Sequence, residues 1–101
     1  MVQGSRSKHS FDLLARKDGW SIPIDIRVAS RGSVGLEDVL ETYAKSMDAE
    51  LRPAIVVAMP AASPDAQKTS YALGIVLVEG SAQDVLEKLE DAIDEIPERK
   101  D

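Results

Sequence analysis

Few side chains of this protein can carry out catalysis. The chain has no cysteine and one histidine, His9, which lies in a polar N-terminal segment. Without a thiol, a disulfide framework and thiolate metal sites are excluded. Ser30 and Ser33 flank a turn before a predicted helix, where a hydroxyl serves as a cap more readily than as a nucleophile. Because no nucleophile stands with a base, we expect no catalytic residues and predict that the protein is not an enzyme.

Carboxylates are abundant, and they concentrate toward the C-terminus. Residues 1–35 carry six Lys or Arg and three Asp, whereas residues 36–101 carry six Lys or Arg and fifteen Asp or Glu. Two carboxylate pairs spaced i,i+4 could each contact a divalent cation: Glu87 with Asp91, and Glu90 with Asp94. No loop wraps an ion there, so we expect a solvated acidic face, no metal site and no cofactor. The acidic balance also argues against nucleic acid as a partner, because phosphates need clustered Lys and Arg.

A glycine-containing turn precedes the first predicted helix. Residues 31–35 read RGSVG, and a helix N-terminus behind such a turn can bind an anion. The turn lacks the Lys-Ser/Thr pair of a P-loop, so a nucleotide site of that type is excluded. The residues that would contact a small ligand at this place are Gly32, Ser33 and Gly35.

Hydrophobic periodicity predicts four strands and two helices in the order ββαββα. Asp18-Gly19 is a tight-turn signal, and it predicts a β-hairpin of residues 10–16 and 20–29. The remaining predictions are a helix from residue 36 to 47, a strand at 54–60, a strand at 69–79 and a helix at 81–96 that Ser81 caps. One domain would span residues 10–97, between a disordered tail at 1–9 and a short tail at 98–101.

Moving the last strand of a ferredoxin-like fold to its front gives this order of elements. We therefore predict an α+β two-layer sandwich, a permuted ferredoxin-like fold in which a four-stranded, mainly antiparallel sheet has both helices on one face. The predicted strand order in space is 10–16, 20–29, 69–79 and 54–60, with right-handed crossovers. A simple meander in chain order is the alternative. No apolar run reaches the roughly 20 residues of a membrane helix, so we expect a soluble, cytoplasmic protein without a membrane partner.

The stretch YALGIVLVEG, residues 71–80, has no polar face if it forms a strand. In a two-layer fold one sheet face lies under the helices and the other is open. The open face would carry small apolar side chains, and we predict them as an interface: Val56, Ala58, Ala72, Gly74, Val76 and Val78. Exposed apolar patches usually mark interfaces, so we expect a protein partner, either a second copy in a homodimer or a larger assembly. Cover by a loop or by the N-terminal tail is the alternative.

From Ile24 onward the chain resembles an ACT domain, a small ferredoxin-like regulatory module of amino-acid metabolism. The similar segments are IDIRVAS, the turn RGSVGL, the helix EDVLETYAKSM and the segment YALGIVLVEGSAQDVLEKLEDAI. In such domains a glycine between the first strand and the first helix lets the helix N-terminus approach a ligand, and Gly32 and Gly35 stand at that place. The resemblance implies sensing of an amino acid or a similar effector at a dimer interface.

Two functions of different classes follow from these features. The first is a non-catalytic protein–protein interaction or assembly module that acts through the apolar sheet face, the edge of strand 54–60 and the acidic last helix. The second, implied by the resemblance, is an ACT-like regulatory domain that senses a small ligand. Binding of amino acids or nucleotides would favour the second, because a ligand of the folded state raises its melting temperature.

Overall fold

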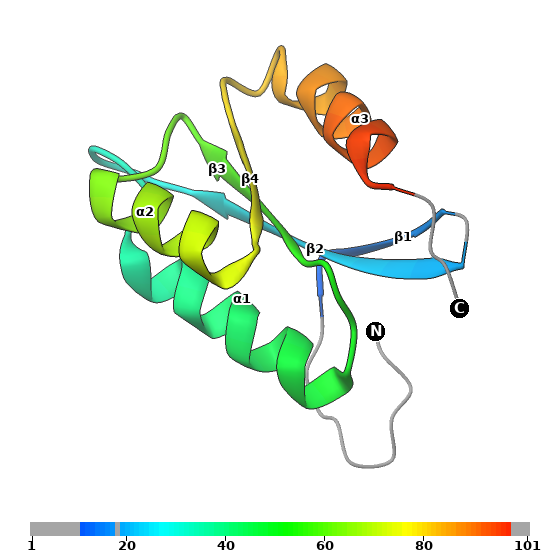
Figure 1. Ribbon diagram of the computed structural model, residues 1–101. Coiled ribbons are helices and arrows are strands. Elements are labelled where there is room, and N and C mark those ends of the chain that lie inside the picture. The colour runs from blue at the N-terminus through cyan, green and yellow to red at the C-terminus, as the bar shows by residue number, and fades with distance from the viewer. Residues whose placement is uncertain (1–10, 18, 98–101) are drawn as a thin grey trace.

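The computed structural model describes residues 11–17 and 19–97, and these form a four-stranded mixed sheet with three helices (Figure 1). The elements in chain order are β1 (Leu13–Lys17), β2 (Trp20–Val28), α1 (Leu36–Ala49), β3 (Ile55–Met59), α2 (Pro64–Leu73), β4 (Val76–Glu79) and α3 (Val85–Glu95). The strand order in space is β1-β2-β3-β4, with β1 antiparallel to β2 and the other two pairs parallel. The tails expected at 1–9 and 98–101 lie outside the described residues.

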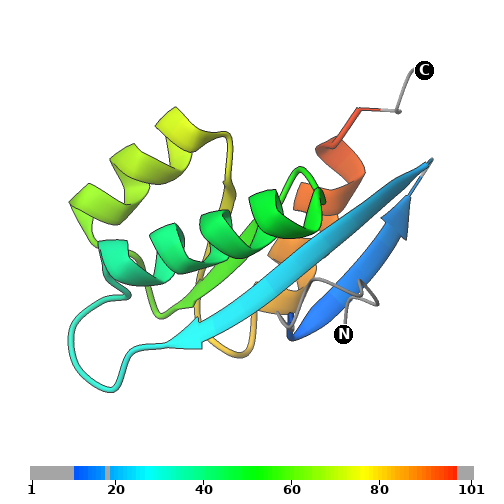
Figure 2. The same cartoon turned by 90° about the horizontal axis from the view of Figure 1, so that it is seen from below.

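Helices cover both faces of this sheet (Figures 1 and 2). α1 and α2 lie on one face, over a core that includes Val39, Val56 and Ala66. α3 lies on the other face, where Leu89 packs in a core with Ile24 and other strand residues. The expected two-layer sandwich with both helices on one face is therefore wrong. The expected mainly antiparallel sheet is also wrong, and a ferredoxin-like fold is not confirmed.

Alternation along the central strands explains the three layers. Ile55 and Val57 of β3 point to the core under α3, whereas Val56 and Ala58 point to the core under α1 and α2. Parallel strands buried on both faces read as continuous apolar runs, and β3 is such a strand. The order of strands is that of the meander alternative, but helices connect β2, β3 and β4, so these strands run parallel.

The segment predicted as a loop and a strand is in fact helix α2. Ser63 caps its N-terminus by accepting a hydrogen bond from the N–H of Ala66 at 3.1 Å, and Pro64 occupies the first turn. The helix ends at Gly74, whose φ of 73° is left-handed, and Ile75 donates its N–H to the carbonyl of Ser70 at 2.8 Å. Ser-Pro at the start and Gly at the end are typical helix boundaries. Strand β4 is consequently short, beginning at Val76.

Replacing Gly74 with alanine is expected to destabilise the domain by about 1–2 kcal/mol, because an L-residue is strained in the left-handed conformation. A Cβ at this position would meet no atom within 4 Å, so the cost is backbone strain without a steric clash. Asparagine, which tolerates this conformation better, is the matched control and should cost less. Urea unfolding of both variants measures the difference; equal stabilities of wild type and Gly74→Ala would contradict the assigned helix end.

Candidate functional site

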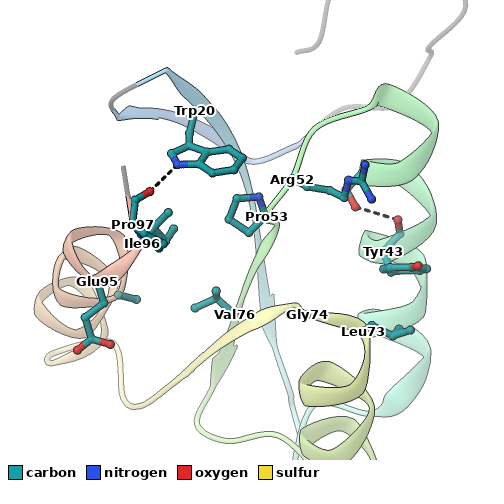
Figure 3. Close-up of a pocket in the computed structure, with 12 residues that line it drawn as sticks. Trp20, Tyr43, Arg52, Pro53, Leu73, Gly74, Val76, Glu95, Ile96 and Pro97 are labelled. Carbon is teal, nitrogen blue, oxygen red and sulfur yellow. Dashed lines mark hydrogen bonds between the residues drawn. The ribbon is translucent and has the colours of Figure 1, made fainter. Parts of the chain in front are cut away.

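A cavity lies at one end of the sheet, and we call it the end pocket (Figure 3). Its volume is about 570 Å³, and it lies between the C-terminal ends of all three helices and the first residues of β4. The lining residues are mostly apolar: Trp20, Tyr43, Ser46, Arg52, Pro53, Leu73, Gly74, Val76, Ala92, Glu95, Ile96 and Pro97. In Figure 3, Trp20, Pro53 and Val76 lie between Ile96 on one side and Leu73 and Tyr43 on the other.

The β1–β2 hairpin holds the α3 wall of the end pocket in place. The Lys17 ammonium donates hydrogen bonds to the carbonyls of Ile93, Asp94 and Ile96 at 2.7, 2.7 and 2.8 Å. These carbonyls belong to the last turn of α3 and the residues after it, where backbone acceptors lack helical partners and a cation is favourable. Trp20 Nε1 donates to the Pro97 carbonyl at 2.7 Å (Figure 3), so the indole is fixed at the pocket wall.

Lys17 should therefore contribute measurably to folding. We expect Lys17→Met to cost about 1–3 kcal/mol, because a charged donor to several carbonyls is lost while the aliphatic stem is kept. Arg16→Met, at an exposed neighbour, is the control and should change the stability by less than about 0.5 kcal/mol. Chemical unfolding of the two variants tests this, and a Lys17→Met protein as stable as Arg16→Met would show that the three bonds contribute nothing.

Two ionic side chains border the otherwise apolar end pocket. Arg52 and Glu95 are both exposed, and Figure 3 shows them on different walls. An apolar cavity with a few convergent polar groups is the usual form of a binding site for small molecules or protruding side chains. The pocket can bind an apolar group and orient a charged substituent, but it contains no nucleophile–base pair.

A smaller cavity, the edge pocket, continues from the end pocket along β4. It has a volume of about 210 Å³ and is lined by Leu77, Val78, Glu79, Lys88, Asp91, Ala92 and Glu95. Ala92 and Glu95 of α3 line both pockets. Two carboxylates, those of Asp91 and Glu95, line this pocket with one ammonium, that of Lys88. The Glu79 carboxylate instead accepts hydrogen bonds from the Ala62 N–H and from Gln67 Nε2, at 2.7 and 3.1 Å. The edge pocket therefore favours a cation, whereas the end pocket favours an apolar group.

A charge cluster on the α1 face surrounds Asp25 of β2, whose side chain is only 1% exposed. Its carboxylate lies 2.7 Å from Lys45 Nζ and 3.5 Å from Arg27, and it accepts a hydrogen bond from the Thr42 hydroxyl at 2.6 Å. The Lys45 ammonium also lies 4.9 Å from the ring centre of Phe11. A buried carboxylate is tolerated because both cations and the hydroxyl compensate its lost hydration.

The Arg27 guanidinium extends the charge cluster to the surface. It lies 3.0 Å from Glu41, 3.4 Å from Asp38 and 3.7 Å from Asp12. Burial by itself would lower the pKa of Arg27, because it disfavours the charged form. The carboxylates of Asp25, Glu41 and Asp38 outweigh this effect, so the pKa of Arg27 is raised. The guanidinium stays charged throughout the physiological pH range, so it neutralises the surrounding carboxylates permanently.

The glycine turn lies apart from the end pocket and the edge pocket. Gly32 and Ser33 are exposed, and Gly35 is the N-cap of α1 without a side-chain hydrogen bond. A Cβ at Gly32 or Gly35 would meet nothing within 4 Å, and none of the three residues lines the end pocket or the edge pocket. Only Gly32 needs glycine, for its φ of 67°. The ligand site expected here stays a prediction.

The six residues expected on an open apolar face do not share a face. Val56 and Ala58 are fully buried under α1 and α2, and Val78 is buried under α3. Val76 packs against the α3 core and lines the end pocket. Ala72 is an exposed residue of α2, and Gly74 is the C-cap of that helix. The open face is therefore wrong, because α3 of the same chain covers it; the expected partner stays a prediction.

The acidic last helix is present, and its carboxylates are exposed. Among the described residues, no group of three or more His, Cys, Asp or Glu is arranged to hold a metal ion. No helix in the described part of the chain combines the length and the apolar character needed to cross a membrane.

Several potential site residues were missed from the sequence. Arg52 and Pro53 lie between the predicted helix and the predicted strand 54–60, and Trp20 was predicted only as the first residue of strand 20–29. Asp25 and Arg27 were predicted only as residues of the same strand. An aspartate at this position gave no sign of burial in the sequence. The side chains that compensate its charge, Thr42 and Lys45, belong to α1, about twenty positions further along the chain.

Fold and pockets together define a three-layer domain with helices on both faces of a mixed sheet. No protein-family model matches this chain, and no curated protein matches it. Its structure is similar to the crystal structure of "Protein of Unknown Function AF1548", with a TM-score of 0.64 and 22% sequence identity. The match covers 76% of this chain and 47% of that one, so the chain spans about half the length of its structural neighbour. This likeness concerns the fold alone.

Proposed function

We propose that this domain is a non-catalytic binding module that takes an apolar group of a partner protein into the end pocket. The observation that carries the proposal is the pocket itself: its volume of about 570 Å³ lies within the usual range for ligand sites, roughly 300–1,000 Å³. Apolar groups gain about 25 cal/mol for each Å² that they withdraw from water. The acidic α3 beside the pocket supplies a charged rim that would favour a basic partner.

A small apolar effector is the alternative occupant of the same pocket. The volume and the position of Arg52 at its border suit a molecule with an apolar body and a carboxylate, such as an amino acid or a fatty acid. This is the small-ligand sensing function expected from the ACT resemblance, located at the end pocket instead of the glycine turn. Competition between an apolar carboxylate and a protein partner for one pocket would show which occupant binds more tightly.

Trp20 is the chain's single tryptophan and lines the end pocket, so its fluorescence reports occupancy. We expect hexanol and hexanoate to change Trp20 emission in a saturable manner, and hexanoate to bind more tightly if Arg52 contributes. Ala92→Phe should lower the affinity about tenfold or more by filling the pocket, because a protruding ring removes the space for the ligand. Ala44→Phe, at an exposed position of α1, is the matched control. Unchanged emission with both probes up to millimolar concentration would contradict the proposal.

A further inference from the structure

The free edge of β4 offers backbone hydrogen-bonding groups to another strand. β4 is the last strand in the sheet order and, among the described strands, pairs only with β3. Val76 and Gly80 donate their N–H groups to carbonyls of β3 or its flank, at 3.0 and 3.3 Å. Because ladder hydrogen bonds alternate along a strand, the N–H groups of Leu77 and Glu79 point away from β3. These groups are available at the edge.

The two pockets follow one another along this edge. Val76 lines the end pocket, whereas Leu77, Val78 and Glu79 line the edge pocket, and Ala92 and Glu95 of α3 belong to both. The two pockets therefore adjoin at β4 and α3, and we call them together the groove. Residues two apart in a strand point to the same side and are about 6.6–6.8 Å apart. A strand laid along the edge would place the side chains of residues i and i+2 in consecutive pockets.

The charges of the groove differ between its two ends. The edge pocket is lined by the carboxylates of Asp91 and Glu95 and by the single cation Lys88, whereas the Glu79 carboxylate is bonded to Ala62 and Gln67 outside it. The end pocket is mainly apolar. The groove therefore complements an apolar side chain at one end and a Lys or Arg at the other.

We propose that this groove binds an extended segment of a partner protein by strand addition to β4. An apolar side chain of the segment enters the end pocket, and a Lys or Arg two residues away enters the edge pocket. The inference rests on the proposed function, since it names the kind of partner that occupies the end pocket. In strand addition the backbone hydrogen bonds supply affinity and the alternate pockets supply selectivity.

Lys88 limits the number of backbone groups of β4 with which an added strand can pair. Its ammonium donates to the Glu79 carbonyl at 3.0 Å, which occupies the last outward acceptor of β4. The added strand therefore pairs with the N–H and carbonyl of Leu77 and with the N–H of Glu79. Such a short contact predicts a modest affinity that depends on both pockets.

Selection from a phage-displayed library of random linear dodecapeptides on the purified domain tests the inference. We expect the enriched peptides to share an apolar residue and a Lys or Arg exactly two positions apart. The best peptide is then made synthetically, together with a version whose basic residue is moved one position so that it points to the opposite side. The moved version should bind about tenfold more weakly or worse, since one pocket is left empty.

Backbone pairing is tested first by changes in the peptide, with the wild-type protein, and then by one protein variant. Methylation of the peptide nitrogen that faces the Leu77 carbonyl should lower the affinity up to about tenfold, and methylation of its neighbours should have little effect. Amide exchange at Leu77 and Glu79 should slow when the peptide binds. Leu77→Pro removes the outward donor without removing a bond to β3, a substitution that edge strands tolerate, and it should also weaken binding.

Three results would overturn the inference. One is the absence of any enriched peptide; another is an enriched pattern with three- and four-residue spacing, which would indicate a helical partner. The third is binding that methylation and Leu77→Pro both leave unchanged. The Trp20 fluorescence experiment with hexanol and hexanoate decides the proposed function separately, because occupation of the end pocket does not require strand addition.

Discussion

Asp25→Ala is expected to destabilise the domain by about 3–5 kcal/mol, because it leaves a buried ammonium and a guanidinium without their shared carboxylate. Lys45 is only 15% exposed and Asp25 is 1% exposed, so water cannot replace the lost partner easily. Stabilities of small domains are about 5–15 kcal/mol, so this one substitution removes a large part of the total. Urea unfolding followed by circular dichroism measures the change.

Two further variants separate the buried pair from the surface charges. Glu41→Gln removes a carboxylate that also contacts Arg27 but is 60% exposed, and we expect a cost of no more than about 1 kcal/mol. Asp25→Ala combined with Lys45→Met should recover part of the lost stability, since the half-buried ammonium that Asp25 contacts is then removed as well. A cost for Asp25→Ala that is no larger than that of Glu41→Gln would show that the charge cluster is not a buried network.

Val78→Asp is expected to prevent stable folding, with a cost above about 4 kcal/mol, because it places a charge in the core under α3. Val78 is 5% exposed and packs in one cluster with Leu89 and Ile96. An aspartate at an intermolecular interface would instead give a folded monomer. The measurement is the circular dichroism spectrum and the thermal transition of the variant, together with its sedimentation.

Val78→Ala gives the graded control for this position, with an expected cost of about 2 kcal/mol from the lost methyl groups and the cavity they leave. Leu86→Asp, at a residue of α3 that is 63% exposed, should fold normally. A well-folded monomeric Val78→Asp protein would contradict the covering of this sheet face by α3 and would restore the open face predicted from sequence.

The local pattern of the sequence was sufficient for several elements. The hairpin around Asp18-Gly19, strand 20–29 and the helix beginning at Leu36 correspond to β1, β2 and α1. α1 has the period of an element that faces water on one side and one core on the other. β2 was recognised from its alternation of apolar and other residues, although the structure buries both of its faces around Pro23 and Asp25. The last helix was also recognised, from its apolar stripe and its acidic opposite face.

The segment from Ser63 to Gly80 was misread because its helix is short and its apolar residues run into those of the next strand. Ser63, Pro64 and Gly74 mark the ends of α2, but Gly74 was interpreted as an interior strand residue. Losing α2 from the prediction removed the crossover between β3 and β4. Without that crossover the two strands were paired as a hairpin, and the sheet became mainly antiparallel.

The sequence by itself determined the elements with a clear hydrophobic period, the acidic character of α3 and the lack of thiol chemistry. Only the tertiary structure decided which faces of the sheet are covered, because an apolar strand has the same sequence pattern whether a helix of its own chain or a partner covers it. The end pocket and the charge cluster also arise at this level. Their residues come from distant segments, such as Trp20 with Pro97 and Asp25 with Lys45, and chain crossovers, which no local periodicity encodes, bring them together.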